Sequence, residues 1–139
     1  MNALLCAAHK IKTAVTLKRL KELNKALLEF PKGFLLNSKL VKAVERRSTL
    51  LDKPDNAKID WATAEELAFA TILEDGIPIR LTGQDSIRGT FSQRHAVFYD
   101  AQTNQGHTPL QKFPQADASF EAINSPLSEA GAIGFEVGY

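Results

Sequence analysis

The sequence predicts an α/β protein in which N-terminal amphipathic helices are followed by part of a parallel-sheet domain. Residues 17–28 and 38–51 place apolar side chains at helical spacing, with Lys and Glu between them. Residues 59–123 then run helix, tight turn, strand, loop and strand, which is the order typical of a parallel sheet. The chain has 139 residues, of which 44% are hydrophobic and 24% charged, so its composition is that of an ordinary globular domain.

The first two helices are bounded by recognisable start and stop signals. Thr16 is the expected N-cap of the first helix, and residues 31–33 (Pro-Lys-Gly) end it. The second helix is expected from Ser38 to Leu51. Residues 52–58 are rich in turn-forming types. We therefore predict a helical arm over residues 1–58 and a compact domain over residues 59–139.

The compact domain is expected to begin with a helix from Trp61 to Glu74, capped by Asp60. A broad apolar face that includes Trp61 and Leu67 predicts burial of this helix against a sheet. Strands are expected at residues 77–82 and 119–123. The stretch 90–118 between them is expected to be irregular, and because it is longer than ordinary connections it is expected to be functional.

Residues 124–139 (NSPLSEAGAIGFEVGY) predict a final helix that tolerates several glycines. The pair Ser125-Pro126 predicts its start and places Glu129 in its first turn. Each glycine costs a helix interior about 1 kcal/mol relative to alanine, and close approach of another backbone or a ligand is the usual offset. Glu129 is either a carboxylate that complements the helix N-terminus or a positioned acid/base, and the glycines favour the second.

Charge and motif content narrow the function classes. Residues 1–50 carry eleven Lys/Arg and three Asp/Glu, a formal charge of +8, and residues 51–139 carry −7. A basic arm for nucleic acid is one interpretation, but aromatic residues do not alternate with the lysines, so a solvated helix face is favoured. The single Cys6 fits a reducing compartment. Residues 1–21 contain no Asp or Glu, which is one feature of a mitochondrial transit peptide. The helical pattern begins within these residues, so we interpret them as the start of the arm.

Common catalytic motifs are absent from the sequence. The three histidines and Cys6 share no metal-ligand spacing, and no Walker, GxSxG or GxGxxG pattern occurs. Residues 83–95 (GQDSIRGTFSQRH) are dense in donors and acceptors. They are equally consistent with a loop that presents Gln84, Asp85, Arg94 and His95 to an anionic ligand and with a strand-end loop held by its own hydrogen bonds.

Three segments carry a family resemblance: residues 59–73 (IDWATAEELAFATIL), residues 75–98 (DGIPIRLTGQDSIRGTFSQRHAVF) and residues 124–139. Together they resemble the thiamine-diphosphate-dependent decarboxylating component of 2-oxoglutarate dehydrogenase. The matching part is the beginning of its transketolase-like, pyrimidine-binding domain. The resemblance covers residues 59–139 and extends more weakly over residues 13–51, a helical connector in that family.

The resemblance implies roles for particular residues. Glu129 corresponds to the carboxyl that hydrogen-bonds the aminopyrimidine ring nitrogen of thiamine diphosphate and so promotes loss of the thiazolium carbon proton. Leu127 is implied as a further contact of the cofactor. The loop residues Gln84, Asp85, Arg94 and His95 are implied to line the substrate site, and His95 is also a candidate proton donor. No residue of this chain is expected to bind metal.

The resemblance also implies partners and a reaction. The family oxidatively decarboxylates 2-oxoglutarate and transfers the succinyl group to lipoyl groups of a succinyltransferase component. In the family, Mg²⁺ and the diphosphate are held by a separate domain with a Gly-Asp-Gly…Asn motif, which this sequence lacks. We expect a homodimeric parent enzyme without nucleic-acid or membrane binding, located in the bacterial cytoplasm or, alternatively, the mitochondrial matrix. The isolated chain is expected to be inactive.

A second hypothesis belongs to another class of function. The chain would be a non-catalytic interaction module in which the amphipathic helices and the glycine-containing helix dock onto a partner chain.

Overall fold

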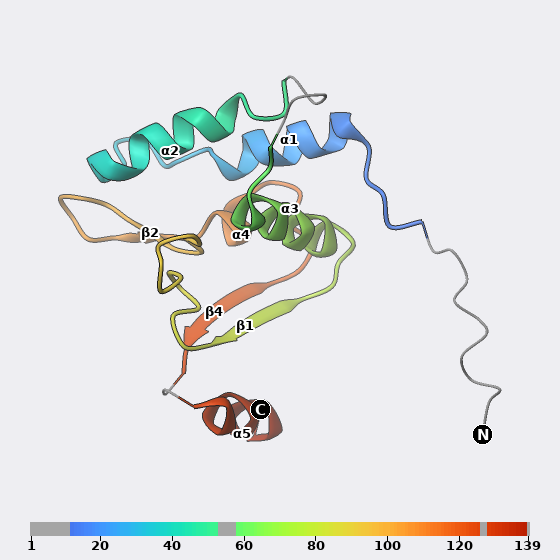
Figure 1. Ribbon diagram of the computed structural model, residues 1–139, viewed down its shortest axis with the longest axis vertical. Helices are drawn as coiled ribbons and strands as arrows, with labels where there is room; N and C mark the ends of the chain where they lie inside the picture. The colour runs from blue at the N-terminus through green and yellow to red at the C-terminus, as the bar shows by residue number, and fades with distance from the viewer. Residues whose placement is uncertain (1–11, 53–57, 126–127, 139) are drawn as a thin grey trace.

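The computed structural model describes residues 12–52, 58–125 and 128–138. At its centre, strands β1 (Ile79–Gly83) and β4 (Phe120–Asn124) pair in parallel, from Ile79 opposite Phe120 to Gly83 opposite Asn124. Helices α3 (Trp61–Glu74) and α4 (Pro109–Lys112) cover one face of this pair, and helix α5 (Glu129–Gly138) lies on the other (Figure 1). The predicted α/β class with a parallel sheet is confirmed.

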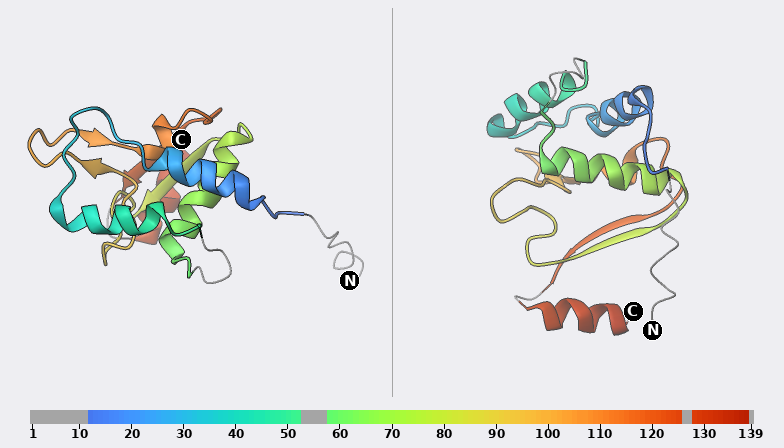
Figure 2. Two further views of the ribbon diagram at one scale, coloured as in Figure 1. Left: turned by 90° about the horizontal axis from the view of Figure 1, so that it is seen from above. Right: turned by 45° about the vertical axis from the view of Figure 1, so that its right-hand side comes forward.

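Two further helices form an outer layer above α3, as the right-hand view of Figure 2 shows. Helix α1 (Leu17–Leu27) begins as predicted, because the Thr16 hydroxyl accepts a hydrogen bond from the Arg19 backbone N–H at 3.3 Å. Helix α2 (Ser38–Ser48) is capped by Asn37 and ends three residues before the predicted Leu51. The arm is therefore two short helices, each fixed by a side-chain cap.

Helix α3 is the element on which the other layers pack. The Asp60 carboxylate accepts the Thr63 backbone N–H at 2.7 Å, and this hydrogen bond lowers the pKa of Asp60. Leu67 and Leu73 are buried, whereas Trp61 is 92% exposed. The prediction that Trp61 belongs to the buried face is wrong, because the buried positions of α3 share the face of Thr63 and Ala70, and Trp61 is about half a helical turn away from that face.

The buried core runs through the arm, α3 and the sheet without interruption. It includes Leu23 and Leu27 of α1, Leu67 and Leu73 of α3, and Phe120 of β4. The arm therefore shares its packing with the sheet-bearing part. The domain boundary between residues 58 and 59 stays a prediction.

The stretch 90–118 is more ordered than predicted. Strands β2 (Phe98–Tyr99) and β3 (Gly106–His107) pair antiparallel, and α4 follows. Strands of two residues show no alternation that a sequence pattern could reveal. The Asp100 carboxylate accepts backbone N–H groups of Leu35, Gln102 and Thr103 at 2.7–2.9 Å, which lowers the pKa of Asp100 to about 2. This carboxylate ties the hairpin to the chain between α1 and α2.

Candidate functional site

Helix α5 places Glu129 at its first position. The Ser128 hydroxyl accepts the Gly131 backbone N–H at 3.1 Å, so Ser128 caps the helix. The helix therefore begins three residues later than the Ser125-Pro126 pair suggested, but Glu129 lies in its first turn as predicted, with an exposed side chain. Leu127, the other predicted cofactor contact, lies outside the described residues.

The start of α5 and the loop after β1 leave from the same edge of the sheet. Gly83 and Asn124 form the last pair of the parallel strands, and the Ser125 backbone N–H donates to the Gly83 carbonyl at 2.9 Å. Gln84 and Asp85 follow β1 immediately, and Gln84 is exposed. In open parallel sheets, ligands bind beyond the carboxyl ends of the strands. Gln84, Asp85 and the first turn of α5 therefore come after the carboxyl ends of the strands, at the edge of the sheet where such ligands bind.

Asp85 is anchored within its own loop. Its backbone has a φ of 55°, in the left-handed region that few non-glycine residues adopt. Its carboxylate accepts the Thr90 hydroxyl at 2.7 Å. Local contacts of this kind keep the loop in a defined shape.

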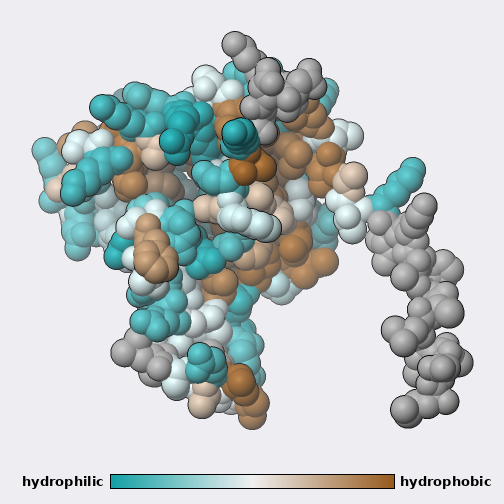
Figure 3. Space-filling view, viewed as in Figure 1, coloured by the Kyte–Doolittle hydropathy of each residue, from teal (hydrophilic) through white to brown (hydrophobic). Residues whose placement is uncertain are grey.

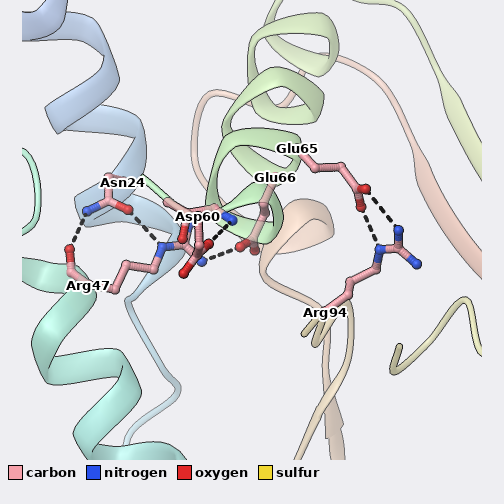
Figure 4. A network of polar contacts seen from close by, with 7 residues as sticks. Asn24, Arg47, Asp60, Glu65, Glu66 and Arg94 are labelled. Carbon is pink, nitrogen blue, oxygen red and sulfur yellow. Dashed lines mark hydrogen bonds and ion pairs between the residues drawn. The ribbon is translucent and has the colours of Figure 1, made fainter. Parts of the chain in front are cut away.

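Arg94 is held by helix α3. Its Nε and Nη2 atoms donate to the two carboxylate oxygens of Glu65 at 2.5 and 2.8 Å (Figure 4). Two parallel hydrogen bonds fix the plane of the guanidinium as well as its position. The carboxylate of Glu65 raises the pKa of Arg94. Arg94 is therefore a fixed positive charge next to α3.

His95 is half-buried, and its ring stacks on Phe98 with centroids 5.8 Å apart. Burial, with a smaller contribution from the nearby charge of Arg88, lowers the pKa of His95. The lowered pKa makes His95 a weaker source of protons at pH 7 than an ordinary histidine.

A cavity of about 770 Å³ lies between α2, α3 and the loop around residues 92–96. Arg94 and His95 are among its lining residues, whereas Gln84, Asp85 and Glu129 are not. In the described part of the chain, the predicted residues therefore fall into two groups. Gln84, Asp85 and Glu129 follow the carboxyl ends of β1 and β4. Arg94 and His95 line the cavity between α2, α3 and the loop around residues 92–96.

A buried polar network next to this cavity was not predicted. Arg47 of α2 forms an ion pair with Glu66 of α3 and donates from Nε to the Asn24 side chain of α1 at 2.9 Å (Figure 4). Burial raises the pKa of Glu66 against the opposing effect of Arg47. Arg47 is 23 positions from Asn24 and 19 positions from Glu66 in the sequence. No local pattern signals contacts over such separations, so only the fold reveals them.

The described residues contain no group of three or more His, Cys, Asp or Glu side chains arranged to hold a metal ion. Over the same residues, no helix has the length and apolar character needed to cross a membrane.

Comparison with known proteins defines the class of this fold. Residues 57–139 match the family described as transketolase, pyrimidine binding domain. The chain belongs to this family of domains.

Two bacterial relatives refine the comparison. The chain is 57% identical over 124 residues to the 2-oxoglutarate dehydrogenase E1 component of Staphylococcus aureus strain N315, and equally to that of strain JH9. The alignment covers 89% of this chain but 14% and 13% of those two proteins. The resemblance to the decarboxylating component is confirmed, and it extends through most of the helical arm.

Proposed function

We propose that this chain is the pyrimidine-binding section of a thiamine-diphosphate-dependent enzyme that oxidatively decarboxylates 2-oxoglutarate and passes the succinyl group to lipoyl groups. The observation that carries the proposal is the placement of Glu129, an exposed carboxylate in the first turn of α5, beyond the carboxyl end of β4. The match of residues 57–139 to pyrimidine-binding domains supports it. A bacterial cytoplasmic location is favoured over the mitochondrial matrix by the bacterial relatives.

The chemistry of Glu129 suits the aminopyrimidine end of the cofactor. A carboxylate accepts an N–H donor strongly, and a helix N-terminus favours its negative charge. When bound, thiamine diphosphate would supply the electron sink for loss of carbon dioxide. Glu129 would hold the proton shared with the ring nitrogen. Leu127 would contact the cofactor, and Gln84, Asp85, Arg94 and His95 would line the substrate site.

The remaining cofactor contacts are proposed to come from outside these 139 residues. The sequence contains no Gly-Asp-Gly motif that could present a metal and the diphosphate together. We therefore propose that Mg²⁺ and the diphosphate are held by another domain, and that the isolated chain does not turn over 2-oxoglutarate.

Calorimetric titration tests this division of the site. Thiamine diphosphate with Mg²⁺, titrated into the 139-residue chain, is expected to give no saturable binding up to millimolar concentration, because the most highly charged part of the ligand has no partner. Thiamine itself, which lacks the diphosphate, is expected to behave in the same way. Saturable micromolar binding that requires Mg²⁺ would contradict the proposal.

Helix α5 also offers a surface for a second subunit. Five residues spaced three or four positions apart form an apolar stripe: Ala130, Ile133, Gly134, Val137 and Gly138. Ile133 is 64% and Val137 84% exposed. Apolar surface at this end of the molecule is brown in Figure 3. We propose that this stripe packs in a homodimer, and that the lipoyl-bearing succinyltransferase component is the second partner of the assembled enzyme.

The same stripe suits the alternative function, a non-catalytic docking module. A substitution at Gly134 tests whether the stripe is an interface. A Cβ at Gly134 would meet no atom within 4 Å. Gly134→Ala is therefore expected to stabilise α5 of the isolated chain by up to about 1 kcal/mol, measured by thermal unfolding.

In an assembled enzyme, Gly134→Ala is expected to be unfavourable. We define the E1 chimera as the Staphylococcus aureus E1 component in which this chain replaces the matching segment. There, Gly134→Ala should weaken the dimer at least about five-fold by analytical ultracentrifugation, as overpacking of a close contact costs about 1–3 kcal/mol. Ser48→Ala, at an exposed position of α2, is the control. An unchanged dimer constant would show that Gly134 is not at the interface.

A further inference from the structure

We propose that Asn124 is a positioning residue that sets the loop of residues 83–96 against the strand leading to Glu129. The inference rests on the proposed function, because it assigns the loop and Glu129 to one site. Asn124 is the last residue of β4 and lies five positions before Glu129.

The side chain of Asn124 joins two segments that the strand pairing alone does not connect. Its Oδ1 atom accepts the backbone N–H of Ile87 at 3.0 Å. Ile87 lies in the loop after β1, beyond the last ladder pair of Gly83 with Asn124. The asparagine side chain therefore extends the contact between these two segments past the end of the sheet.

Two further hydrogen bonds hold the same corner. The Gly83 carbonyl accepts the Ser125 backbone N–H at 2.9 Å and the Ser86 hydroxyl at 3.1 Å. The φ of Gly83 is 148°, a conformation that side-chain-bearing residues rarely adopt. The first turn of the loop is thus held by two hydrogen bonds, one from Ser86 within the loop and one from Ser125, the residue after Asn124.

Hydrogen bonds continue from Ile87 to the neighbourhood of His95. The Ile87 carbonyl accepts the Ala96 backbone N–H at 3.0 Å, and Arg88 forms an antiparallel bridge with His95. An unbroken path therefore leads from the strand before Glu129 through Asn124 and Ile87 to the backbone beside His95. Its last part lies next to the cavity that His95 lines.

This path explains how two groups of residues keep a fixed relative position. One group follows the ends of the strands (Gln84, Asp85 and Glu129), and the other lines the cavity (Arg94 and His95). Misplacing a reacting group by about 1 Å costs catalysis on the order of a hundred-fold. Asn124 acts on both groups through the loop backbone, where its Oδ1 atom accepts the Ile87 N–H. Its effect is expected on kcat rather than on the KM for 2-oxoglutarate.

Hydrogen exchange of the 139-residue chain tests the contact itself. Asn124→Ala is expected to speed exchange of the Ile87 amide about five-fold, the equivalent of one hydrogen bond of about 1 kcal/mol. Asn124→Asp retains the acceptor and should restore slow exchange. Asn37→Ala removes a matched contact, an asparagine Oδ1 that accepts the Lys39 N–H at 3.0 Å, and should leave Ile87 unchanged. Unchanged Ile87 exchange in Asn124→Ala would overturn the proposal.

Turnover of the E1 chimera tests the positioning role. Asn124→Ala is expected to lower kcat at least about ten-fold with KM within about two-fold, Asn124→Asp to recover most of it, and Asn37→Ala to leave it unchanged. An unchanged kcat in Asn124→Ala would overturn the inference. If Glu129→Gln kept full activity, the proposed function would fail instead, and the exchange result for Ile87 would still stand.

Discussion

Glu129→Gln in the E1 chimera is expected to lower kcat by about 10² to 10⁴, the range over which a positioned acid/base contributes to a reaction. Glutamine has nearly the same shape but holds no negative charge and cannot take up a proton. The loss should appear equally in kcat and in kcat/KM, because the interaction would be made in the transition state. Steady-state turnover of 2-oxoglutarate at saturating thiamine diphosphate and Mg²⁺ measures it.

The control for Glu129 lies on the same helix. Glu136 is also a carboxylate of α5, but it forms an ion pair with Arg80 of β1 at 3.2 Å. Glu136→Gln removes an equal charge from α5, and surface ion pairs contribute about 1 kcal/mol or less. Its kcat is expected to stay within about three-fold of the unsubstituted chimera. Equal losses in the two variants would show that the charge of the helix, and not the position of Glu129, matters.

Arg47→Ala is expected to destabilise the 139-residue chain by about 3–5 kcal/mol, because it leaves the Glu66 carboxylate buried without its partner. The same change removes the hydrogen bond from Arg47 Nε to the Asn24 side chain. Such a loss is a large part of the roughly 5–15 kcal/mol that stabilises a domain. Urea unfolding followed by far-UV circular dichroism measures it; Trp61 is too exposed for its fluorescence to report on the core.

The neighbouring pair on α3 is the matched control. Arg94 and Glu65 have side chains that are 27% and 34% exposed, whereas those of Arg47 and Glu66 are each 15% exposed. Arg94→Ala should therefore cost about 1 kcal/mol or less. The double change Arg47→Met with Glu66→Leu should recover most of the stability, because it removes both buried charges. Equal costs for Arg47→Ala and Arg94→Ala would contradict the assigned burial.

The cost of Arg47→Ala should also depend on pH. Burial raises the pKa of Glu66, and removal of Arg47 raises it further. A carboxyl with a folded pKa above its unfolded pKa of about 4.3 binds more protons when folded, so stability falls as the pH rises through that interval. Arg47→Ala should therefore be less destabilising at pH 5 than at pH 7. This difference should disappear when Glu66→Gln is added.

Local signals were sufficient for the frame of the fold. Thr16 and Asp60 cap their helices through side-chain hydrogen bonds, as their residue types and positions predict. The glycine-containing helix forms with Glu129 in its first turn. These features depend on residues within a few positions of one another, where hydrogen-bond and helix preferences act directly.

Features that depend on tertiary contact were not predictable in the same way. Arg47, Glu66 and Asn24 meet only because α1, α2 and α3 pack together. Arg94 was predicted as a site-lining residue, but its partner Glu65 is 29 positions away on α3. Each of these charges could have been a solvated surface group. Only the arrangement of the layers distinguishes them.

Close approach to the glycines was also expected from the sequence. Within the described part of the chain, an added Cβ at Gly134 or Gly138 would meet nothing within 4 Å. The helical cost of these glycines therefore has no offset from neighbouring atoms of the described chain. A partner subunit on the stripe of α5 is our proposed offset.

Turnover of 2-oxoglutarate by the unsubstituted E1 chimera tests the central claim most directly. The claim is that this chain supplies the pyrimidine-binding section, with Glu129, to a site completed by other domains. With thiamine diphosphate and Mg²⁺, the folded chimera is expected to release carbon dioxide from 2-oxoglutarate at a rate within about ten-fold of the unaltered Staphylococcus aureus E1 component. A chimera that folds, dimerises and binds the cofactor but releases no carbon dioxide would contradict the claim.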